Sequence, residues 1–145
     1  MSSAKLIDIL LVEDNPADVR LAQETLKDYR LQNTLHVLKD GAEALAYLRR
    51  QPPFDNALVP DLVMLDLTLP KVDGAEVLAE MQSDEALRNL PVVILTSSES
   101  DERMLRNLNV AADCFVMKPL TLERCLEAIR CYPHLGLSIV RIATA

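Results

Sequence analysis

The feature that most constrains the fold is a series of five short apolar segments, each followed by apolar residues at helical spacing. The apolar segments cover residues 6–12, 34–38, 62–67, 91–95 and 114–117. The helical stretches cover residues 16–29, 42–48, 77–81, 104–108 and 122–129. Parallel strands need long connections, which are usually helical. The alternation therefore predicts an α/β fold with a doubly wound, five-stranded parallel sheet. We expect the strand order 2-1-3-4-5, in which the first and third strands are neighbours.

Length and charge narrow the class of protein further. The 145 residues suit one domain, predicted at 5–131, with a C-terminal extension at 132–145. No segment approaches the roughly 20 apolar residues of a membrane span, and no apolar leader opens the chain, which predicts a cytoplasmic protein. The net charge of -7 and the lack of a long basic run argue against a nucleic-acid partner.

The cysteines predict a reducing compartment. Cys114, Cys125 and Cys131 are odd in number and contain no CxxC pair. We interpret them as thiols, and not as a disulfide framework or a zinc site.

Polar residues stand where the predicted strands end. Glu13 and Asp14 follow the first strand, Asp66 lies in the third, and Thr96 and Lys118 follow the fourth and fifth. Ligands of open parallel sheets bind at these carboxyl ends. Clustered carboxylates require a compensating cation, and Mg²⁺ prefers such oxygen ligands. A carboxylate in an apolar strand is costly unless it is paired or has a function. Together with the other strand-end residues, this predicts that Asp66 is a nucleophile for phosphoryl transfer.

Four segments carry a resemblance to the receiver domain of two-component response regulators. They are ILLVEDNPAD at 9–18, DLVMLDLTLPKVDG at 61–74, PVVILTSS at 91–98 and FVMKP at 115–119. The resemblance implies a flavodoxin-like receiver fold in which Asp66 is the phosphoacceptor. It also implies Mg²⁺ ligands at Glu13, Asp14, Asp66 and the backbone carbonyl of Thr68.

The same resemblance assigns the switching residues and the partner. Thr96 and Lys118 would contact the phosphoryl group, and Phe115 stands where the family has its switch aromatic. The donor would be a sensor histidine kinase. The loop after Leu48, the phrase KDGAEALAYLR and the C-terminal extension resemble single-domain regulators that serve phytochrome-type kinases. The alternative is a stand-alone receiver for another histidine kinase, or a phosphorelay intermediate.

Three rival functions are weaker. A phosphohydrolase of the haloacid dehalogenase kind would need a second acid where Thr68 stands. A flavin-binding protein of this topology would not place Glu13 and Asp14 where a phosphate must bind. An unphosphorylated interaction module would not need the intact set of polar strand-end residues. The expected role is therefore signalling, and not enzymatic catalysis.

A receiver without an output domain must signal through its surface. The fourth helix, the fifth strand and the final helix carry mixed charges that could pair across a two-fold axis. Residues 135–142 are too apolar for a free tail. We expect a homodimer through this face with the tail contributing; the alternative is a tail that packs on its own domain.

Overall fold

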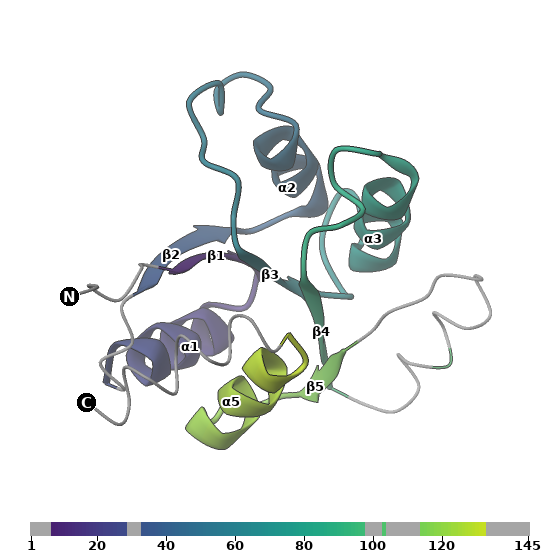
Figure 1. Cartoon of the computed structure of the whole chain (residues 1–145). Helices are drawn as coiled ribbons and strands as arrows, with labels where there is room; N and C mark the ends of the chain where they lie inside the picture. The colour runs from purple at the N-terminus through teal and green to yellow at the C-terminus, as the bar shows by residue number, and fades with distance from the viewer. Residues whose placement is uncertain (1–6, 29–32, 98–102, 104–113, 133–145) are drawn as a thin grey trace.

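The computed structural model describes residues 7–28, 33–97, 103 and 114–132. Five parallel strands form one sheet in the order β2-β1-β3-β4-β5 (Figure 1). The strands are β1 (Ile7–Val12), β2 (Asn33–Leu38), β3 (Leu62–Asp66), β4 (Val92–Thr96) and β5 (Phe115–Met117). The helices are α1 (Pro16–Asp28), α2 (Gly41–Leu48), α3 (Gly74–Ser83) and α5 (Leu122–Arg130). The predicted fold class and strand order are confirmed.

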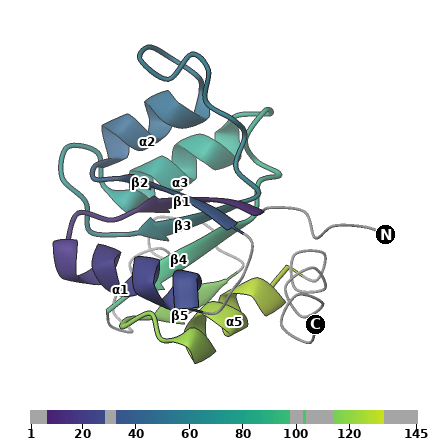
Figure 2. The ribbon, with the colours of Figure 1, turned by 90° about the vertical axis from the view of Figure 1, so that its left-hand side faces the viewer.

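Helices cover both faces of the sheet, with α1 and α5 on one side and α2 and α3 on the other (Figure 2). Alternate residues of each strand point to opposite faces. In β1, Ile9 and Leu11 pack with Ala22 of α1 and Cys125 of α5. Their neighbour Leu10 packs on the other face with Val77 of α3. Both faces of the central strands are thus buried, which explains why these strands are apolar throughout.

Short polar side chains fix where the helices begin. The Asn15 carboxamide oxygen accepts the backbone N–H of Ala17 at 2.9 Å, just before Pro16 opens α1. Asp40 and Asp73 cap α2 and α3 in the same way. Gly74 is required at the start of α3, because a Cβ there would overlap the carbonyl oxygen of Asp66. These capping interactions fix the loops between each strand and the helix that follows it.

The strand limits differ slightly from the predicted ones. The third strand ends at Asp66, although the apolar segment continues to Leu67. Leu67 is buried in the following turn, where its carbonyl accepts the N–H of Gly74 at 2.8 Å. The fourth strand extends to Thr96, one residue beyond its apolar segment. The predicted fourth helix at 104–108 and the C-terminal tail lie outside the described residues.

The prediction of three free thiols is wrong for two of them. Cys114 and Cys131 form a disulfide, and only Cys125 among the described cysteines is a thiol. Cys114 directly precedes β5 and Cys131 directly follows α5. Because α5 runs back along the sheet, the two Cα atoms come within 6.2 Å, a normal separation for a disulfide. The two cysteines are 17 positions apart in the sequence and match no short cysteine motif, so their pairing follows only from the fold.

Candidate functional site

The carboxyl ends of four strands converge on one site. Glu13 follows β1, Asp66 ends β3, Thr96 ends β4 and Lys118 follows β5. Backbone hydrogen bonds hold two of these positions: the N–H of Glu13 donates to Leu38 at 2.9 Å, and the N–H of Lys118 donates to Thr96 at 2.8 Å. The sheet thus extends by one residue past β1 and β5, and this brings their side chains to the same edge.

The ammonium group of Lys118 lies among three carboxylates. Its Nζ is 2.6 Å from Glu13 Oε1, 2.8 Å from Asp66 Oδ2 and 3.1 Å from Asp18 Oδ2. The first two were expected from strand ends. Asp18 was not assigned a role from the sequence, because it lies in the first turn of α1 and not at a strand end. The available signal was its position three residues after the capping Asn15, close behind Glu13 and Asp14.

Burial makes the charge balance of this site unfavourable. Glu13 is 1% exposed and Asp66 is 6% exposed. Burial, and then the hydrogen bond and negative charge of Asp66, raise the pKa of Glu13 to about 7 in spite of Lys118. The pKa of Lys118 is raised in turn, because its contacts with Asp66 and Glu13 outweigh its own burial. One cation is therefore shared by more negative charge than it can neutralise.

Asp66 is held in a fixed orientation. Its Oδ1 accepts the backbone N–H of Thr68 at 3.1 Å, while Oδ2 accepts from Lys118. Both donors lie at the carboxyl edge of the sheet, so the carboxylate faces the site and not the core. An oriented carboxylate beside an ammonium group is suited to attack an electrophile that carries negative oxygens.

The acidic residues can hold a hard cation. Glu13, Asp14 and Asp66 each offer a carboxylate oxygen, and these oxygens all lie within 4.8 Å of one another. Glu13 Oε1 is fully buried and accepts no well-directed hydrogen bond, although the Lys118 ammonium lies close to it. Asp14 is exposed, which leaves access from solvent. An all-oxygen donor set of this kind fits a divalent cation such as Mg²⁺ or Mn²⁺.

The two predicted switch residues lie on the neighbouring strands β4 and β5, with Thr96 opposite Met117 and not opposite Phe115. Thr96 is buried at the end of β4. Phe115 begins β5 beside Ile94, and its half-buried ring packs on the α2–α3 side of the core. Thr68 is exposed in the loop after β3, where its N–H is committed to Asp66. The residues predicted for the site thus lie at the carboxyl edge of the sheet, except Phe115, which begins β5 next to Cys114.

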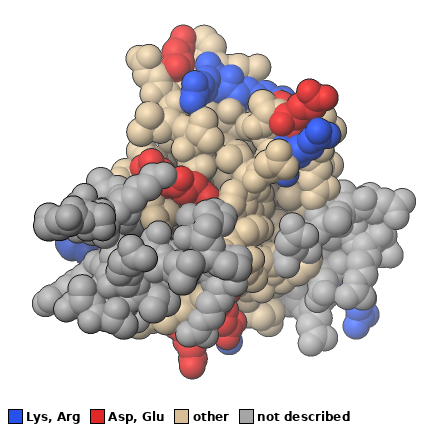
Figure 3. All heavy atoms as spheres, viewed as in Figure 1, with Lys and Arg blue, Asp and Glu red and all other residues tan. Residues whose placement is uncertain are grey.

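The remaining surface features lie elsewhere. His36 in β2 lies near Tyr47, with ring centroids 5.9 Å apart and ring planes tilted by 42°. On the face in Figure 3, lysine and arginine near α2 and α3 lie beside acidic side chains; Arg49 pairs with Glu80 at 2.7 Å. Among the described residues, no helix has the length and apolarity to cross a bilayer.

Comparison with known proteins gives one consistent family. The model of the response regulator receiver domain matches residues 9–130. Response regulator Rcp1 of a Synechocystis species is 37% identical over 137 residues, covering 94% of this chain and 93% of that protein.

Solved structures agree. The bacteriophytochrome response regulator AtBRR has a TM-score of 0.82 at 40% identity, covering 89% of this chain and 94% of the other. The phosphorylated cyanobacterial phytochrome response regulator RcpA has a TM-score of 0.74 at 37% identity, with 97% of each chain covered. A Mn²⁺-bound form of Rcp1 has a TM-score of 0.72 at 37% identity, with 90% of this chain and 89% of the other covered. With this fold and this strand-end cluster, the chain belongs to the response regulator receiver family, whose members act as phosphoryl acceptors in two-component signalling.

Proposed function

We propose that this protein is a single-domain response regulator in which Asp66 takes a phosphoryl group from a phosphohistidine of a sensor kinase. The observation that carries the proposal is the orientation of Asp66, with Lys118 Nζ at 2.8 Å from one oxygen and the N–H of Thr68 at 3.1 Å from the other. In the transfer, the P–N bond breaks, an O–P bond forms at Asp66, and the released imidazole takes up a proton. The chain is modified in this step, and is not proposed to be an enzyme acting on another substrate.

The acidic pocket is proposed to bind Mg²⁺ through Glu13, Asp14, Asp66 and the carbonyl of Thr68. The buried, poorly satisfied oxygen of Glu13 supports this assignment. A bound Mg²⁺ would supply positive charge to the phosphoryl oxygens during transfer. Lys118 would keep its contact with the site as the counterion of the new phosphoryl group, and Thr96 would donate its hydroxyl to it.

The kinase is proposed to be of the phytochrome type, in a cytoplasmic light-signalling pair. Support comes from relatives named as phytochrome or bacteriophytochrome response regulators that match most of this chain. The alternative is that the protein accepts phosphoryl groups from another histidine kinase, or is an intermediate in a phosphorelay. Phosphotransfer rates from a panel of purified kinases would decide: a phytochrome-type kinase should be the fastest donor, and a faster donor of another type would select the alternative.

Phosphorylation is proposed to move Thr96 and Phe115 together. Drawing the Thr96 hydroxyl toward a phosphoryl group vacates space that the half-buried Phe115 ring can fill. The chain contains only two phenylalanines, so para-fluorophenylalanine gives one signal for Phe115 and one for Phe54, which is the control. Beryllofluoride, a phosphoryl mimic, should shift the Phe115 signal alone. An unchanged Phe115 signal would contradict the coupling.

The receiver domain, proposed at 5–131, would signal as a homodimer through a face that contains β5, α5 and the helix predicted at 104–108. Residues 132–145 would contribute to this face. Met117 and Leu122 support this face, since they are 41% and 37% exposed and apolar. Sedimentation of the full chain, of a form ending at Tyr132 and of Leu122→Glu would test it, each with and without beryllofluoride. We expect weaker dimers for both variants; monomers throughout would end the idea.

The phosphoacceptor assignment has a matched control on the same strand segment. Asp66→Asn should abolish labelling by acetyl phosphate in Mg²⁺. Asp61→Asn should label normally, because Asp61 lies at the opposite end of β3 and accepts the N–H of Asp8 at 2.9 Å. Phosphate-affinity gel electrophoresis gives the fraction labelled. Equal labelling of Asp66→Asn and the unmodified protein would refute the proposal.

A further inference from the structure

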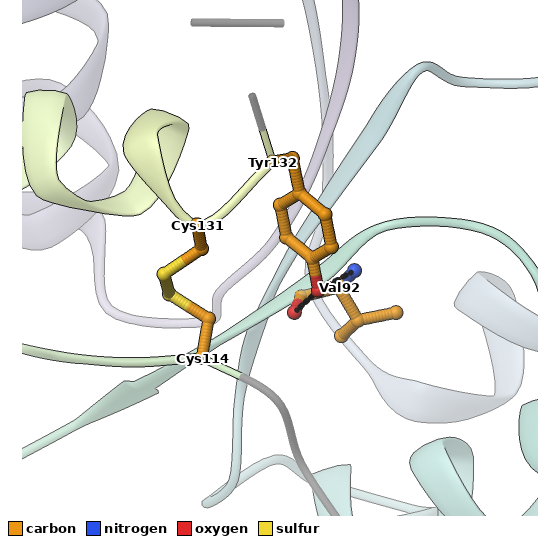
Figure 4. The surroundings of a disulfide bond; sticks show 4 residues. All are labelled: Val92, Cys114, Cys131 and Tyr132. Atoms are coloured by element: carbon orange, nitrogen blue, oxygen red, sulfur yellow. Dashed lines mark hydrogen bonds between the residues drawn. A yellow bond between two sulfur atoms is a disulfide. The ribbon is translucent and has the colours of Figure 1, made fainter. Parts of the chain in front are cut away.

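A covalent link lies beside the proposed output face. The disulfide between Cys114 and Cys131 joins the residue before β5 to the residue after α5 (Figure 4). The next residue, Tyr132, places its hydroxyl between the two backbone groups of Val92: it donates to the carbonyl at 2.7 Å and accepts the N–H at 3.0 Å. The end of α5 is thus fixed to the starts of both β4 and β5.

This link directly adjoins the switch aromatic. The carbonyl of Cys114 accepts the N–H of Ile94 at 2.9 Å, and Phe115 is the next residue. A loop of residues 114–131, closed by the disulfide, contains all of β5 and α5. Any displacement of Phe115 must therefore occur in a segment whose two ends are tied together.

One sulfur of the pair is accessible and the other is not. Cys131 is exposed, whereas Cys114 is only 3% exposed. Cys125 is 1% exposed, and burial raises the pKa of its thiol to about 11. Cys125 therefore stays protonated and is a poor partner for thiol–disulfide exchange. A reductant from solvent would reach the bond at Cys131.

We propose that Cys114 and Cys131 form a reversible thiol modification site, through which a dithiol reductant frees the β5–α5 segment and so changes how far Phe115 and α5 respond to phosphorylation. This inference rests on the proposed function for its output. In the cytosol, where that function places the chain, disulfides of ordinary proteins are rare, and those that occur are usually transient or redox-sensing.

The exchange has two steps. A thiolate of the reductant attacks Sγ of Cys131, the S–S bond breaks, and the sulfur of Cys114 leaves as a thiolate and takes up a proton. The second thiol of the reductant then displaces Cys131, which also ends as a thiol. The reductant ends as a disulfide, and an oxidised dithiol drives the reverse reaction.

The test compares the oxidised and the dithiothreitol-reduced protein, each labelled with para-fluorophenylalanine. Reduction should shift the Phe115 signal and leave Phe54 unchanged. It should also speed amide hydrogen exchange in α5 by about tenfold, because the closing constraint on that segment is lost. Cys131→Ser should match the reduced protein under both conditions. Cys125→Ala, the control, should keep the full redox response.

Two results would overturn the proposal. One is failure of mild oxidation to protect Cys131 from alkylation in the folded protein. The other is an identical Phe115 signal and identical α5 exchange in the two redox states.

Repeating both measurements with beryllofluoride distinguishes failure of this inference from failure of the proposed function. Suppose that reduction shifts the Phe115 signal without beryllofluoride, but that acetyl phosphate labels Asp66 in neither redox state. This result would refute Asp66 as the phosphoacceptor and its coupling to Phe115, and would leave the thiol site standing. Suppose instead that Asp66 is labelled normally and that beryllofluoride shifts the Phe115 signal equally in the oxidised and reduced proteins. This result would refute the redox control and leave the proposed function standing.

Discussion

The two ends of the sheet are stabilised in opposite ways. At the carboxyl end, Glu13, Asp18 and Asp66 share the single ammonium group of Lys118, and the pKa of Glu13 rises to about 7. At the amino end, the disulfide and Tyr132 tie α5 to β4 and β5, and the backbone N–H of Val92 has a hydrogen-bond partner. The carboxyl end keeps unbalanced charge, whereas at the amino end both backbone groups of Val92 are hydrogen-bonded to Tyr132.

This difference between the two ends places the functional site at the carboxyl end of the sheet. A site that must receive a cation and a phosphoryl group cannot also neutralise its own carboxylates, so it lowers the stability of the unliganded protein. The covalent and hydrogen-bonded amino end holds the strands in register while the other end changes its charge. Substitutions at the charged carboxyl end and at the cross-linked amino end should therefore change stability and phosphorylation differently.

Lys118→Ala should give the largest loss of stability. It leaves buried carboxylates without their cation, which typically costs several kcal/mol. Glu13 can take up a proton and relieve part of this, so we expect a loss of about 2 kcal/mol above pH 7 in urea unfolding, and less below. Lys71→Ala is the control, because Lys71 is 70% exposed in its pair with Asp40 and should change little. If the two variants lost the same free energy of unfolding, the buried carboxylates of the site would not depend on Lys118 for their stability.

Tyr132→Phe should have the next largest effect. It removes the hydroxyl that both donates to and accepts from Val92, and leaves two part-buried backbone groups without it. We expect a loss of about 1 to 2 kcal/mol in the free energy of unfolding, with phosphoryl labelling of Asp66 unchanged. Ser83→Ala removes an exposed hydrogen bond to Glu80 and serves as the control. A loss of labelling in Tyr132→Phe would mean that the two ends are coupled.

Asp66→Asn should have the smallest effect, and in the opposite direction. The folded pKa of Glu13 is raised above its unfolded value of 4.5, so its ionisation costs stability as pH rises from 4.5 to about 7. Removing the charge of Asp66 lowers that pKa. The metal-free variant should therefore be more stable than the unmodified protein by about 1 kcal/mol above pH 7, with the difference shrinking toward pH 4.5.

Magnesium provides the matching control for that prediction. Mg²⁺ should stabilise the unmodified protein more than Asp66→Asn, because the variant lacks one proposed ligand. Thermal unfolding with and without Mg²⁺ measures this. A variant that is less stable than the unmodified protein at every pH, or that gains equally from Mg²⁺, would contradict the charge account of the site.

Much of the fold was predictable because its signals are local. Five apolar segments in alternation with helical spacing determine a parallel sheet, and the carboxyl ends of its strands bring Glu13, Asp66 and Lys118 together. Asp18 was missed because its contact depends on how α1 leaves the sheet. The disulfide and the Tyr132 contact were missed because both depend on the return of α5 along the sheet, which no spacing rule encodes.

The most direct test of the central claim is to identify the residue that carries the phosphoryl group. Protein phosphorylated with acetyl phosphate and Mg²⁺ is reduced with borohydride, which converts an aspartyl phosphate to homoserine, and is then mapped by peptide mass spectrometry. We expect homoserine at position 66, only after phosphorylation and in no other peptide. Homoserine at Asp14, Asp18 or another aspartate, or an acid-stable phosphate on a hydroxyl side chain with Asp66 unmodified, would contradict it.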